Sequence, residues 1–490
     1  VKYGVSPARY DETLFATDKV RYVGDEIAAV AAVDLATALE ALSLIKVEYD
    51  PLPAVFDPLE ALAEGAPVIH DEFPGNVCAE VHQEFGDVEA ALAKADYVRT
   101  DTLRNKRQDG GFIETHCAVA LPDLNGRITL YSATQVPHYV QRNVAMVLGL
   151  ELSKLRVIKP YVGGGFGPKA EATPLDYCST ALALITGKPV KMAYTREQVF
   201  LHSRARHQFI HEMTTGVTRD GKLLALKHRA ILDGGAYTSF GIATVYYSGS
   251  LLGGPYRMAN MQYDGLRAFT NKPACGAQRG HGGVIARALF ERQLDLIAKE
   301  LGVDPVRMRL DNMMEVGDVT CNDLNMSSLG MRECIEAVRD GSDWGAKKGK
   351  LAKGKGIGVA CGFFVSGAGY PIYRSETYHS TVTLKVDEDG GGVKVLSASA
   401  EIGQGSDTVL GMIAAESLGV PLDLVRVESG STDFGVDLGA YSSRQTLMSG
   451  HACRDAALMA KGRILASVAA ELGADPADLD FKNGVLVSRG

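Results

Sequence analysis

Three glycine-rich segments of the chain set polar or aromatic residues between glycines, a pattern that suits contact with an anionic ligand. The segments are residues 163–167 (GGGFG), 275–282 (CGAQRGHG) and 402–406 (IGQGS). Because glycine has no Cβ atom, such turns let backbone N–H groups approach a bound group directly. Three of them, far apart in the sequence, predict one large ligand with several anionic arms. The alternative is that they are ordinary turns of a globular protein.

Polar side chains in and near these segments fit the same chemistry. Arg279 lies between Gln278 and Gly280, and its planar guanidinium suits a carboxylate, phosphate or oxo group. Gln404, between two glycines, is typical of a polar nest for a phosphate or a polar ring. Residues 439–444 (GAYSSR) place hydroxyl groups just before a predicted helix, whose N-terminus could bind an anion. Taken singly, an arginine paired with a carboxylate or a serine that caps a helix would also explain these motifs.

The chain lacks the spacing of common nucleotide-binding and hydrolase motifs. The dinucleotide fingerprint fails in the first turn at Pro168. Residues 349–355 approach a phosphate loop, but Gly356 stands where Ser or Thr is needed. No G-x-S-x-G elbow occurs, which disfavours a serine hydrolase. The glycine turns therefore predict a ligand of another kind.

Histidine and cysteine spacing predicts no metal site built from side chains. His207 and His211 are four residues apart, but they lie in an alternating, strand-like segment and no H-E-x-x-H motif occurs. We therefore expect a core or surface role for both. The eight cysteines form no C-x-x-C pair, which fits reduced thiols in a cytosolic protein. The same spacing leaves no local site for an iron–sulfur cluster or structural zinc.

The composition is that of a multidomain globular protein. A chain of 490 residues is too long for one ordinary core, so about two to four domains are expected. Its 46% hydrophobic and 22% charged residues exclude a disordered chain. A net charge of −8 without a basic cluster disfavours nucleic-acid binding, and no apolar run is long enough to span a membrane.

The elements that must position the candidate residues follow a mixed α+β pattern. Residues 19–50 predict strand, helix and strand, with Asp34 capping the helix. Aromatic residues between 237 and 247 predict a packed strand face or, as the alternative, the lining of a substrate channel. Further helices are predicted at 58–64, 136–148, 176–186, 284–301, 407–418 and 449–472, and strands at 128–133, 155–160, 208–217, 223–233, 380–386 and 393–400.

Taken together, seven segments resemble the large, molybdopterin-binding subunit of the xanthine dehydrogenase/aldehyde oxidase family. Within that family the likeness is strongest to the 4-hydroxybenzoyl-CoA reductase α subunit. It covers essentially the whole chain in order, which makes it more specific than any single loop. The segments are residues 18–25 (DKVRYVGD), 134–137 (TQVP), 157–167, 276–282, 364–367 (FVSG), 402–406 and 441–444.

The resemblance implies a multidomain α+β fold. A partial α/β hammerhead domain would occupy residues 1–65. Residues 66–95 would connect it to a first molybdopterin-binding domain at 96–340. A linker at 341–356 would lead to a second such domain at 357–490, incomplete at its C-terminal end.

The resemblance also implies a cofactor, a mononuclear molybdenum held by a pterin dithiolene with a cytosine dinucleotide tail. No side chain would bind the metal. Gln135 would hydrogen-bond its apical oxo group, and Arg279 would belong to a second loop beneath it. Gln404 would hold the pterin or its phosphates, assisted by Ser442 and Ser443. The implied cofactor-binding residues are Gln135, Gly164, Gly165, Phe166, Gly167, Ala277, Gln278, Arg279, Gly280, Gly403, Gln404, Gly405, Ser406, Ser442 and Ser443.

Departures from other members of the family bear on the substrate. Xanthine-type members carry an aromatic residue where His281 stands and a glutamate where Ala170 stands, so purine hydroxylation is not expected. His281, Phe240 and Tyr247 would face the substrate. The loop at 276–282 lacks the cysteine of carbon monoxide dehydrogenases and is similar to the reductase type. The implied reaction is reductive dehydroxylation of a 4-hydroxybenzoyl-CoA-type thioester, and the alternative is hydroxylation of an aldehyde or N-heterocycle with water.

No glutamate of this chain matches the family's catalytic glutamate, so the catalytic residue is left unassigned. The chain starts at Val1 and ends within a predicted hairpin, so we expect a piece truncated at both ends, or a subunit whose missing part is a second polypeptide. A cofactor-binding scaffold that does not turn over substrate is a further alternative. The resemblance also implies iron–sulfur and FAD partner subunits, assembly as a dimer of heterotrimers and a cytoplasmic location.

Overall fold

A computed structural model describes residues 1–5, 9–367 and 379–488. The chain forms two compact units, each made of segments that are discontinuous in sequence. The first unit contains Val1–Leu52, Asp109–Arg204 and Val365–Gly490, and the second contains Pro53–Gln108 and Ala205–Phe364. The domain ranges predicted above stay a prediction, and residues 368–378 and 489–490 of the expected second cofactor-binding domain lie outside the described residues.

In one part of the first unit, a four-stranded sheet forms one layer and two helices form a second layer packed on it. The sheet has the order β7-β6-β5-β8, with β6 parallel to β7 and the other pairs antiparallel. Helices α4 (Pro137–Leu148) and α5 (Pro174–Thr186) pack on this sheet and on each other. Both begin with proline, whose missing N–H costs nothing in the first turn, and both end at a left-handed glycine. The strands are β5 (Cys117–Pro122), β6 (Ile128–Ser132), β7 (Leu155–Ile158) and β8 (Val190–Ala193).

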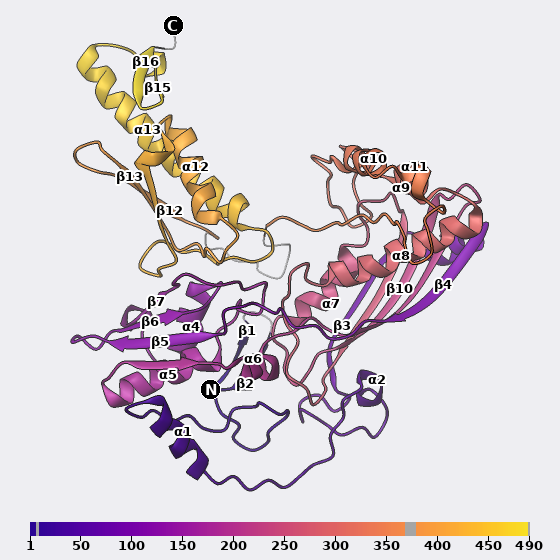
Figure 1. Cartoon of the computed structure of the whole chain (residues 1–490), viewed down its shortest axis with the longest axis horizontal. Coiled ribbons are helices and arrows are strands. Elements are labelled where there is room, and N and C mark those ends of the chain that lie inside the picture. Colours follow the sequence, from indigo (N-terminus) through magenta and orange to yellow (C-terminus); the bar gives the residue numbers. More distant parts are fainter. Residues whose placement is uncertain (6–8, 368–378, 489–490) are drawn as a thin grey trace. The chain divides into compact units, whose positions relative to one another are not determined.

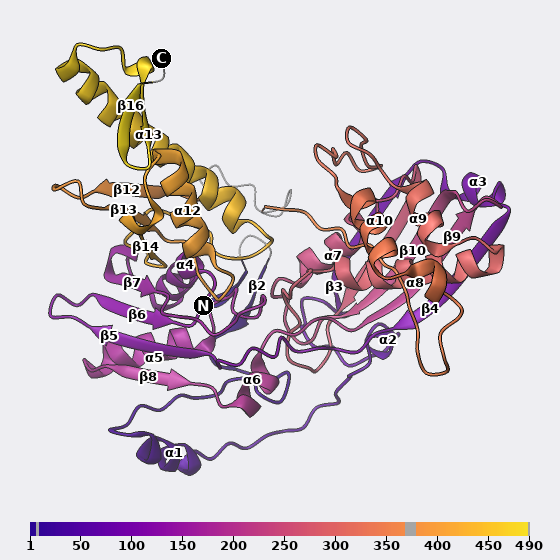
Figure 2. The same cartoon turned by 45° about the horizontal axis from the view of Figure 1, so that its top comes forward.

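A second, three-stranded sheet of the same unit lies against two long helices. In this sheet, β13 (Val393–Ser397) pairs antiparallel with β12 (Val382–Val386) and parallel with β14 (Val425–Ser429). Helix α12 (Ser406–Leu418) makes the crossover between the parallel strands and packs on α13 (Gly450–Leu472) (Figure 2). The described part of this unit also contains the hairpins β1–β2 (Lys2–Val5, Arg9–Thr13) and β15–β16 (Leu479–Lys482, Val485–Ser488). It further contains the helices α1 (Leu35–Leu44) and α6 (Arg196–His202) and short helical turns at 152–154, 422–424, 445–449 and 476–478.

The second unit is a five-stranded sheet with helices along it (Figure 1). The strand order is β3-β11-β10-β9-β4, in which only β10 and β11 run parallel. Helices α7 (Gly241–Ser250) and α8 (Gly283–Leu301) pack on the sheet, and α9 (Pro305–Asn312) packs on α8. The strands are β3 (Val77–Phe85), β4 (Tyr97–Arg104), β9 (Phe209–Val217), β10 (Leu223–Asp233) and β11 (Asn260–Ala268), and the remaining helices are α2 (Pro58–Ala61), α3 (Val88–Ala93), α10 (Met331–Gly341) and α11 (Trp344–Lys347).

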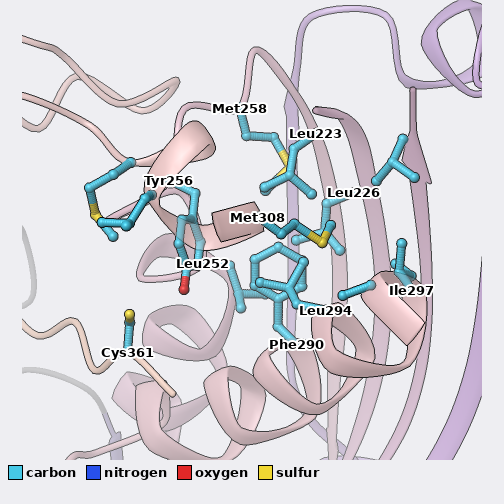
Figure 3. Close-up of a cluster of buried hydrophobic side chains, with 14 of the residues drawn as sticks. Leu223, Leu226, Leu252, Tyr256, Met258, Phe290, Leu294, Ile297, Met308 and Cys361 are labelled. Carbon is cyan, nitrogen blue, oxygen red and sulfur yellow. The ribbon is translucent and has the colours of Figure 1, made fainter. Parts of the chain in front are cut away.

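The core of the second unit lies between β10, α8 and α9. Phe290, Leu294 and Ile297 of α8 face Leu223 and Leu226 of β10 (Figure 3). Burial of each such side chain stabilises the fold by about 1.5–3 kcal/mol. The helical spacing of the apolar residues in 284–301 predicted this helix, and the structure confirms it.

The predicted strands around α1 (Leu35–Leu44) are wrong. Asp34 caps the helix as predicted, because its side chain accepts a hydrogen bond from the N–H of Thr37. The flanking segments, however, form no strand in the described residues, and none of the side chains of α1 is buried. A β-branched sequence becomes a strand only where a neighbouring strand pairs with it, and none does here.

Two further features differ from the sequence-based expectation. Residues 241–250 of the aromatic segment form α7, where a strand face was predicted, because the segment packs as a helix across β3 and β11. Strand β3 lies inside the stretch predicted as a connector. None of the described helices has the length and apolar character required to cross a membrane.

Candidate cofactor site

The first glycine turn is held at both ends by one carboxylate. The Glu114 Oε2 atom accepts hydrogen bonds from the Gly163 N–H (2.8 Å) and from the Lys169 Nζ (2.6 Å). Lys169 is fully buried, and its ammonium lies 4.8 Å from the centre of the Phe112 ring. Burial lowers the pKa of Lys169, although the Glu114 carboxylate opposes this. The pair fixes the distance between the two ends of the turn.

Inside the turn the backbone takes left-handed conformations. Gly164 and Gly167 have φ of 96° and 111°, and Phe166 has φ of 56°. A side chain in this region costs roughly 1–2 kcal/mol, so the contacts around Phe166 must hold it there. Strained backbone of this kind clusters at ligand sites.

Gln135 joins the turn to a second loop of the same unit. Its Oε1 accepts from the Gly167 N–H (2.8 Å), and its Nε2 donates to the Ala440 carbonyl (2.5 Å). A Cβ atom on Gly165 would lie 2.8 Å from the Gln135 Cδ, so only glycine fits against this side chain. Gln135, the turn and the loop at 437–444 therefore form one cluster.

The loop at 437–444 is also strained and contains an unsatisfied hydroxyl. Ser442 and Ser443 both have positive φ, 51° and 53°. The fully buried Arg444 ties the loop together by donating to Asp437 Oδ1 (3.1 Å) and to the Gly439 carbonyl (2.8 Å). The Ser442 Oγ is shielded from solvent and has no hydrogen-bond partner among the described residues. Such a group costs about 1–3 kcal/mol unless a ligand or water satisfies it.

In the third glycine segment, the chain's own carboxylate fills the nest at the start of α12. Glu401 accepts from the N–H groups of Gly403 (2.7 Å), Gly405 (3.1 Å) and Asp407 (3.1 Å). Partial burial opposes ionisation of Glu401, but these N–H groups outweigh it and lower its pKa. The Lys159 Nζ donates to the Glu401 carbonyl (2.9 Å), which connects this loop to the segment before the first turn.

The Gln404 side chain is likewise used within its own loop. Its Oε1 accepts from the Ile402 N–H (2.7 Å), and its Nε2 donates to the Ala400 carbonyl (2.9 Å) and to Ser406 Oγ (3.1 Å). Gly403 and Gln404 are exposed, and open space surrounds both loop glycines. The loop therefore has a fixed shape and an accessible surface, while its amides are already bonded to Glu401.

The second glycine segment lies in the second unit. Its loop begins with a hydrogen bond from the Gly276 N–H to the Ala205 carbonyl (3.1 Å). The Gln278 side chain is buried, whereas the Arg279 side chain is exposed to solvent. A Cβ on Gly282 would lie 2.5 Å from the Thr244 carbonyl, because the loop presses closely on α7.

The residues expected to face substrate cluster around the same loop. His281 Nε2 forms a hydrogen bond with Thr244 Oγ1, and its ring lies 6.1 Å from that of Tyr247. Tyr247 also contacts Phe364 (6.3 Å), and the side chains of Phe240 and Tyr247 are both buried. Burial, followed by the charges of Arg206 and Arg267, lowers the pKa of His281 to about 3. The imidazole is therefore uncharged at neutral pH.

His207 and His211 have structural partners inside the second unit. His207 Nε2 accepts from Arg267 Nε (3.1 Å), and His211 Nδ1 bonds His228 Nε2 (2.9 Å). No group of three His, Cys, Asp or Glu side chains that could hold a metal ion occurs within the described ranges.

Sequence reasoning missed Glu114, Lys169, Glu401 and Arg206, which fix the three turns. Lys169 follows the first turn by two residues, so its position carried a weak signal. Glu114 lies about fifty residues away from its partners, and only the fold brings it there. Glu401 directly precedes Ile402 and could have been recognised as a carboxylate that caps the helix after the loop.

The residues of the first unit fit a pterin cofactor with anionic groups. The unpartnered Ser442 hydroxyl, the two strained serines and the open surface of the Gly403–Gln404 loop are features that a polar ligand would use. Gln135 and the turn at 163–167 form the adjoining wall of this cluster.

Comparison with known proteins agrees with this chemistry. Residues 69–313 and 337–489 match families described as molybdopterin cofactor-binding domain. Residues 2–53 match the a/b hammerhead domain of aldehyde oxidase and xanthine dehydrogenase. These matches confirm the predicted multidomain fold class and show that the chain contains molybdopterin cofactor-binding domains.

Relatives and solved structures extend the likeness along the whole chain. A nicotinate dehydrogenase large molybdopterin subunit of Eubacterium barkeri is 38% identical over 331 residues, 67% of this chain and 77% of that protein. A putative xanthine dehydrogenase molybdenum-binding subunit of Escherichia coli (strain K12) is 34% identical over 484 residues, 96% of this chain. The structure of quinoline 2-oxidoreductase from Pseudomonas putida 86 matches with a TM-score of 0.93 and 28% identity over 100% of this chain.

The chain spans 63% of the Escherichia coli relative and 64% of the quinoline 2-oxidoreductase chain. Within that span, the cofactor-binding and hammerhead matches occur in the order in which the resemblance placed them. The chain belongs to the xanthine dehydrogenase/aldehyde oxidase family and corresponds to its molybdopterin-binding large subunit.

Proposed function

We propose that the chain is the molybdenum-cofactor part of an oxidoreductase that hydroxylates an N-heteroaromatic compound with water as the oxygen source. One observation carries the cofactor assignment: Gln135 joins the strained turn to the loop that bears the unpartnered Ser442 hydroxyl. The relatives support the substrate class, because xanthine, nicotinate and quinoline, the compounds in their names, all contain a ring nitrogen.

When bound, the cofactor would supply two-electron redox chemistry and Lewis-acid activation. The chain's own residues would bind the cofactor and orient the substrate. Gln135 is held by Gly167 and Ala440, so its amide is preorganised beside the first turn. The Ser442 hydroxyl would donate a hydrogen bond to the cofactor. His281, uncharged at neutral pH, would hold Thr244 and Tyr247 in place beside the loop, where these residues would line the substrate site.

Reductive dehydroxylation of a 4-hydroxybenzoyl-CoA-type thioester stays a prediction, as does a scaffold role in which another segment or chain supplies the catalytic glutamate. The cytosine dinucleotide form of the cofactor, the iron–sulfur and FAD partner subunits, their dimer of heterotrimers and a cytoplasmic location are also part of this proposal. The relatives support partner subunits, because two of them are themselves named as subunits.

The test is to purify the chain with its natural partners, measure bound molybdenum and supply quinoline, nicotinate, xanthine and 4-hydroxybenzoyl-CoA separately in ¹⁸O-labelled water. We expect about one molybdenum per chain and a labelled hydroxyl group on a heterocycle. Absence of molybdenum from the complex would overturn the proposal. Turnover of the thioester alone would replace it with the reductase reaction, and bound molybdenum without any turnover would favour the scaffold role.

A further inference from the structure

Arg206 is held rigidly beside the second glycine segment. Residues 205–208 run between two other pieces of backbone in the second unit. Arg206 forms a bridge with Gln108, in which the Arg206 N–H donates to the Gln108 carbonyl (2.7 Å). On the other side Ala205 is bridged to Cys275, at the start of the loop. The direction in which the Arg206 side chain leaves the backbone is therefore fixed.

The guanidinium of Arg206 is only partly used by the protein. Its Nη2 donates to the carbonyl of Arg279, at the centre of the loop. Its Nη1 is shielded from solvent and has no hydrogen-bond partner in the described part of the chain. Burial lowers the pKa of Arg206, and no carboxylate contributes to offset it. A shielded charged donor atom without a partner is costly even in a partly buried side chain, so the Nη1 atom points to an acceptor supplied from outside.

The surroundings of Arg206 are cationic. The Arg206 and Arg267 guanidinium groups, after burial, lower the pKa of His281. Burial and then Arg267, His281, Arg107 and Arg206 lower the pKa of His207 well below its ordinary value. Asp233 is already paired with Lys272 Nζ (2.5 Å). The charges of Arg206 and Arg267 beside His281 therefore favour an anion near the loop.

The loop also contains an unmatched acceptor. Gln278 is 7% exposed, and its Oε1 has no partner within the described residues. Gln278 directly precedes Arg279, whose carbonyl receives the Arg206 bond. Arg206 Nη1 and Gln278 Oε1 are thus a charged donor and a neutral acceptor at this loop, and no group in the described chain satisfies either.

We propose that Arg206 binds an oxyanion of the ligand that contacts the loop of residues 275–282, and that the Gln278 amide oxygen accepts a hydrogen bond from a polar group of that ligand. The inference rests on the proposed function, which brings two oxyanions to this loop: a carboxylate on the heteroaromatic substrate or a phosphate of the cofactor. Both have the acceptor geometry that a guanidinium prefers.

The experiment compares Arg206→Gln and Arg206→Lys with Arg107→Gln in the purified complex. Arg107 is a matched control, because its Nη1 donates to the Pro273 carbonyl (2.5 Å) in the segment just before the loop. Calorimetric titration with nicotinate, nicotinamide and inorganic phosphate measures binding directly. Bound molybdenum and released cytidine phosphate measure cofactor content.

A substrate carboxylate predicts that Arg206→Gln weakens nicotinate binding about 10- to 100-fold, the loss of one charge-assisted hydrogen bond. Nicotinamide binding and cofactor content would stay unchanged. A cofactor phosphate predicts instead that cofactor content falls several-fold in Arg206→Gln but not in Arg107→Gln. In either case, Arg206→Lys keeps the charge but loses the planar guanidinium. Its nicotinate affinity or cofactor content should therefore lie between those of the wild type and Arg206→Gln.

The inference is overturned if Arg206→Gln matches Arg107→Gln in anion binding and in cofactor content. If Arg206→Gln does not fold, Arg206→Lys carries the same comparison with Arg107→Lys. If the wild-type complex lacks molybdenum, the proposed function fails. The titration with inorganic phosphate still decides the role of Arg206, because it needs neither cofactor nor turnover.

Discussion

The first glycine turn owes its shape to single side chains that reach it from distant parts of the sequence. Glu114 and Lys169 bind its two ends, and Gln135 binds its last amide. The sequence predicted the turn and Gln135, because glycines and a family motif are local signals. It could not predict Glu114, whose partners depend on the sheet, or the left-handed Ser442, because serine carries no local signal for positive φ.

Replacing Gln135 by alanine should lower both stability and cofactor content. The change removes two hydrogen bonds and leaves the Gly167 N–H and the Ala440 carbonyl unsatisfied, so we expect a loss of about 1–3 kcal/mol in the free energy of unfolding. Urea denaturation and metal analysis measure the two effects. Gln141→Ala is the control, because Gln141 binds the Leu155 carbonyl (2.6 Å) in the same layer. It should lower stability similarly but leave the molybdenum content unchanged, and an equal loss of molybdenum would contradict the role given to Gln135.

Replacing Lys169 by methionine should destabilise the first unit by about 2 kcal/mol, because Glu114 loses its cation. The figure stays below that for a fully buried pair, since Glu114 is 32% exposed. A double-mutant cycle with Glu114→Gln, followed by urea denaturation, measures the coupling. Additive effects of the two changes would show that the pair does not hold the turn.

At the level of elements, sequence patterns predicted the helices whose apolar residues recur periodically. They failed for segments whose structure depends on pairing or packing with distant parts of the chain. The helix α8 followed from its apolar spacing, and the start of α1 from Asp34, whose side chain caps it. The segments around α1 failed because strands need neighbours, and α7 failed because aromatic residues suit strands and buried helices alike. The sheet of the second unit also contains a buried polar row, His211 and His228, that no alternation of apolar residues reveals.

Acidification should weaken the sheet through these histidines. Burial lowers the pKa of His211 to about 4 and that of His228 further. Below an unfolded pKa of about 6.5 the unfolded chain takes up protons first, so stability is lost as pH falls from about 6.5 toward 4. His211 alone accounts for about 2 kcal/mol near pH 5.

Urea denaturation at pH 7.5 and pH 5 measures this effect. His211→Asn should reduce the acid sensitivity, whereas His82→Asn should not, because His82 is exposed and its pKa is raised by Asp264. Glu12 acts in the opposite direction: burial raises its pKa to about 7, so its contribution grows as pH falls from 7 to 4.5. A His211→Asn variant that loses as much stability between pH 7.5 and pH 5 as the wild type would contradict the assignment of a neutral, buried histidine.

At the level of the whole molecule, the two units have separate buried ion clusters. In the first, Arg204 donates to Glu12 (2.7 Å) and Glu171 (3.1 Å), all three being nearly buried. In the second, the fully buried Arg309 donates to Glu291 and Asp295, both at 2.8 Å. Removal of one partner from such a cluster leaves an uncompensated charge and costs about 3–5 kcal/mol.

Scanning calorimetry should therefore separate the units. Arg204→Met should shift the unfolding transition of the first unit to lower temperature and leave the other in place, and Arg309→Met should do the reverse. Each variant serves as the control for the other. A single transition that both variants shift equally would show that the units unfold as one cooperative body.

The interleaved order of segments has a consequence for protein synthesis. The second unit ends at Phe364, so all of its strands have been made while the ribosome is still translating the rest of the chain. The first unit includes Val1, yet its α12–α13 layer is translated after the whole second unit. The sheet of strands β5 to β8 is therefore translated before the α12–α13 layer, and its loops have no contact with that layer while the second unit is synthesised. The loops that form the cofactor cluster can therefore meet only after the whole second unit has been translated, so cofactor insertion must follow the synthesis of that unit.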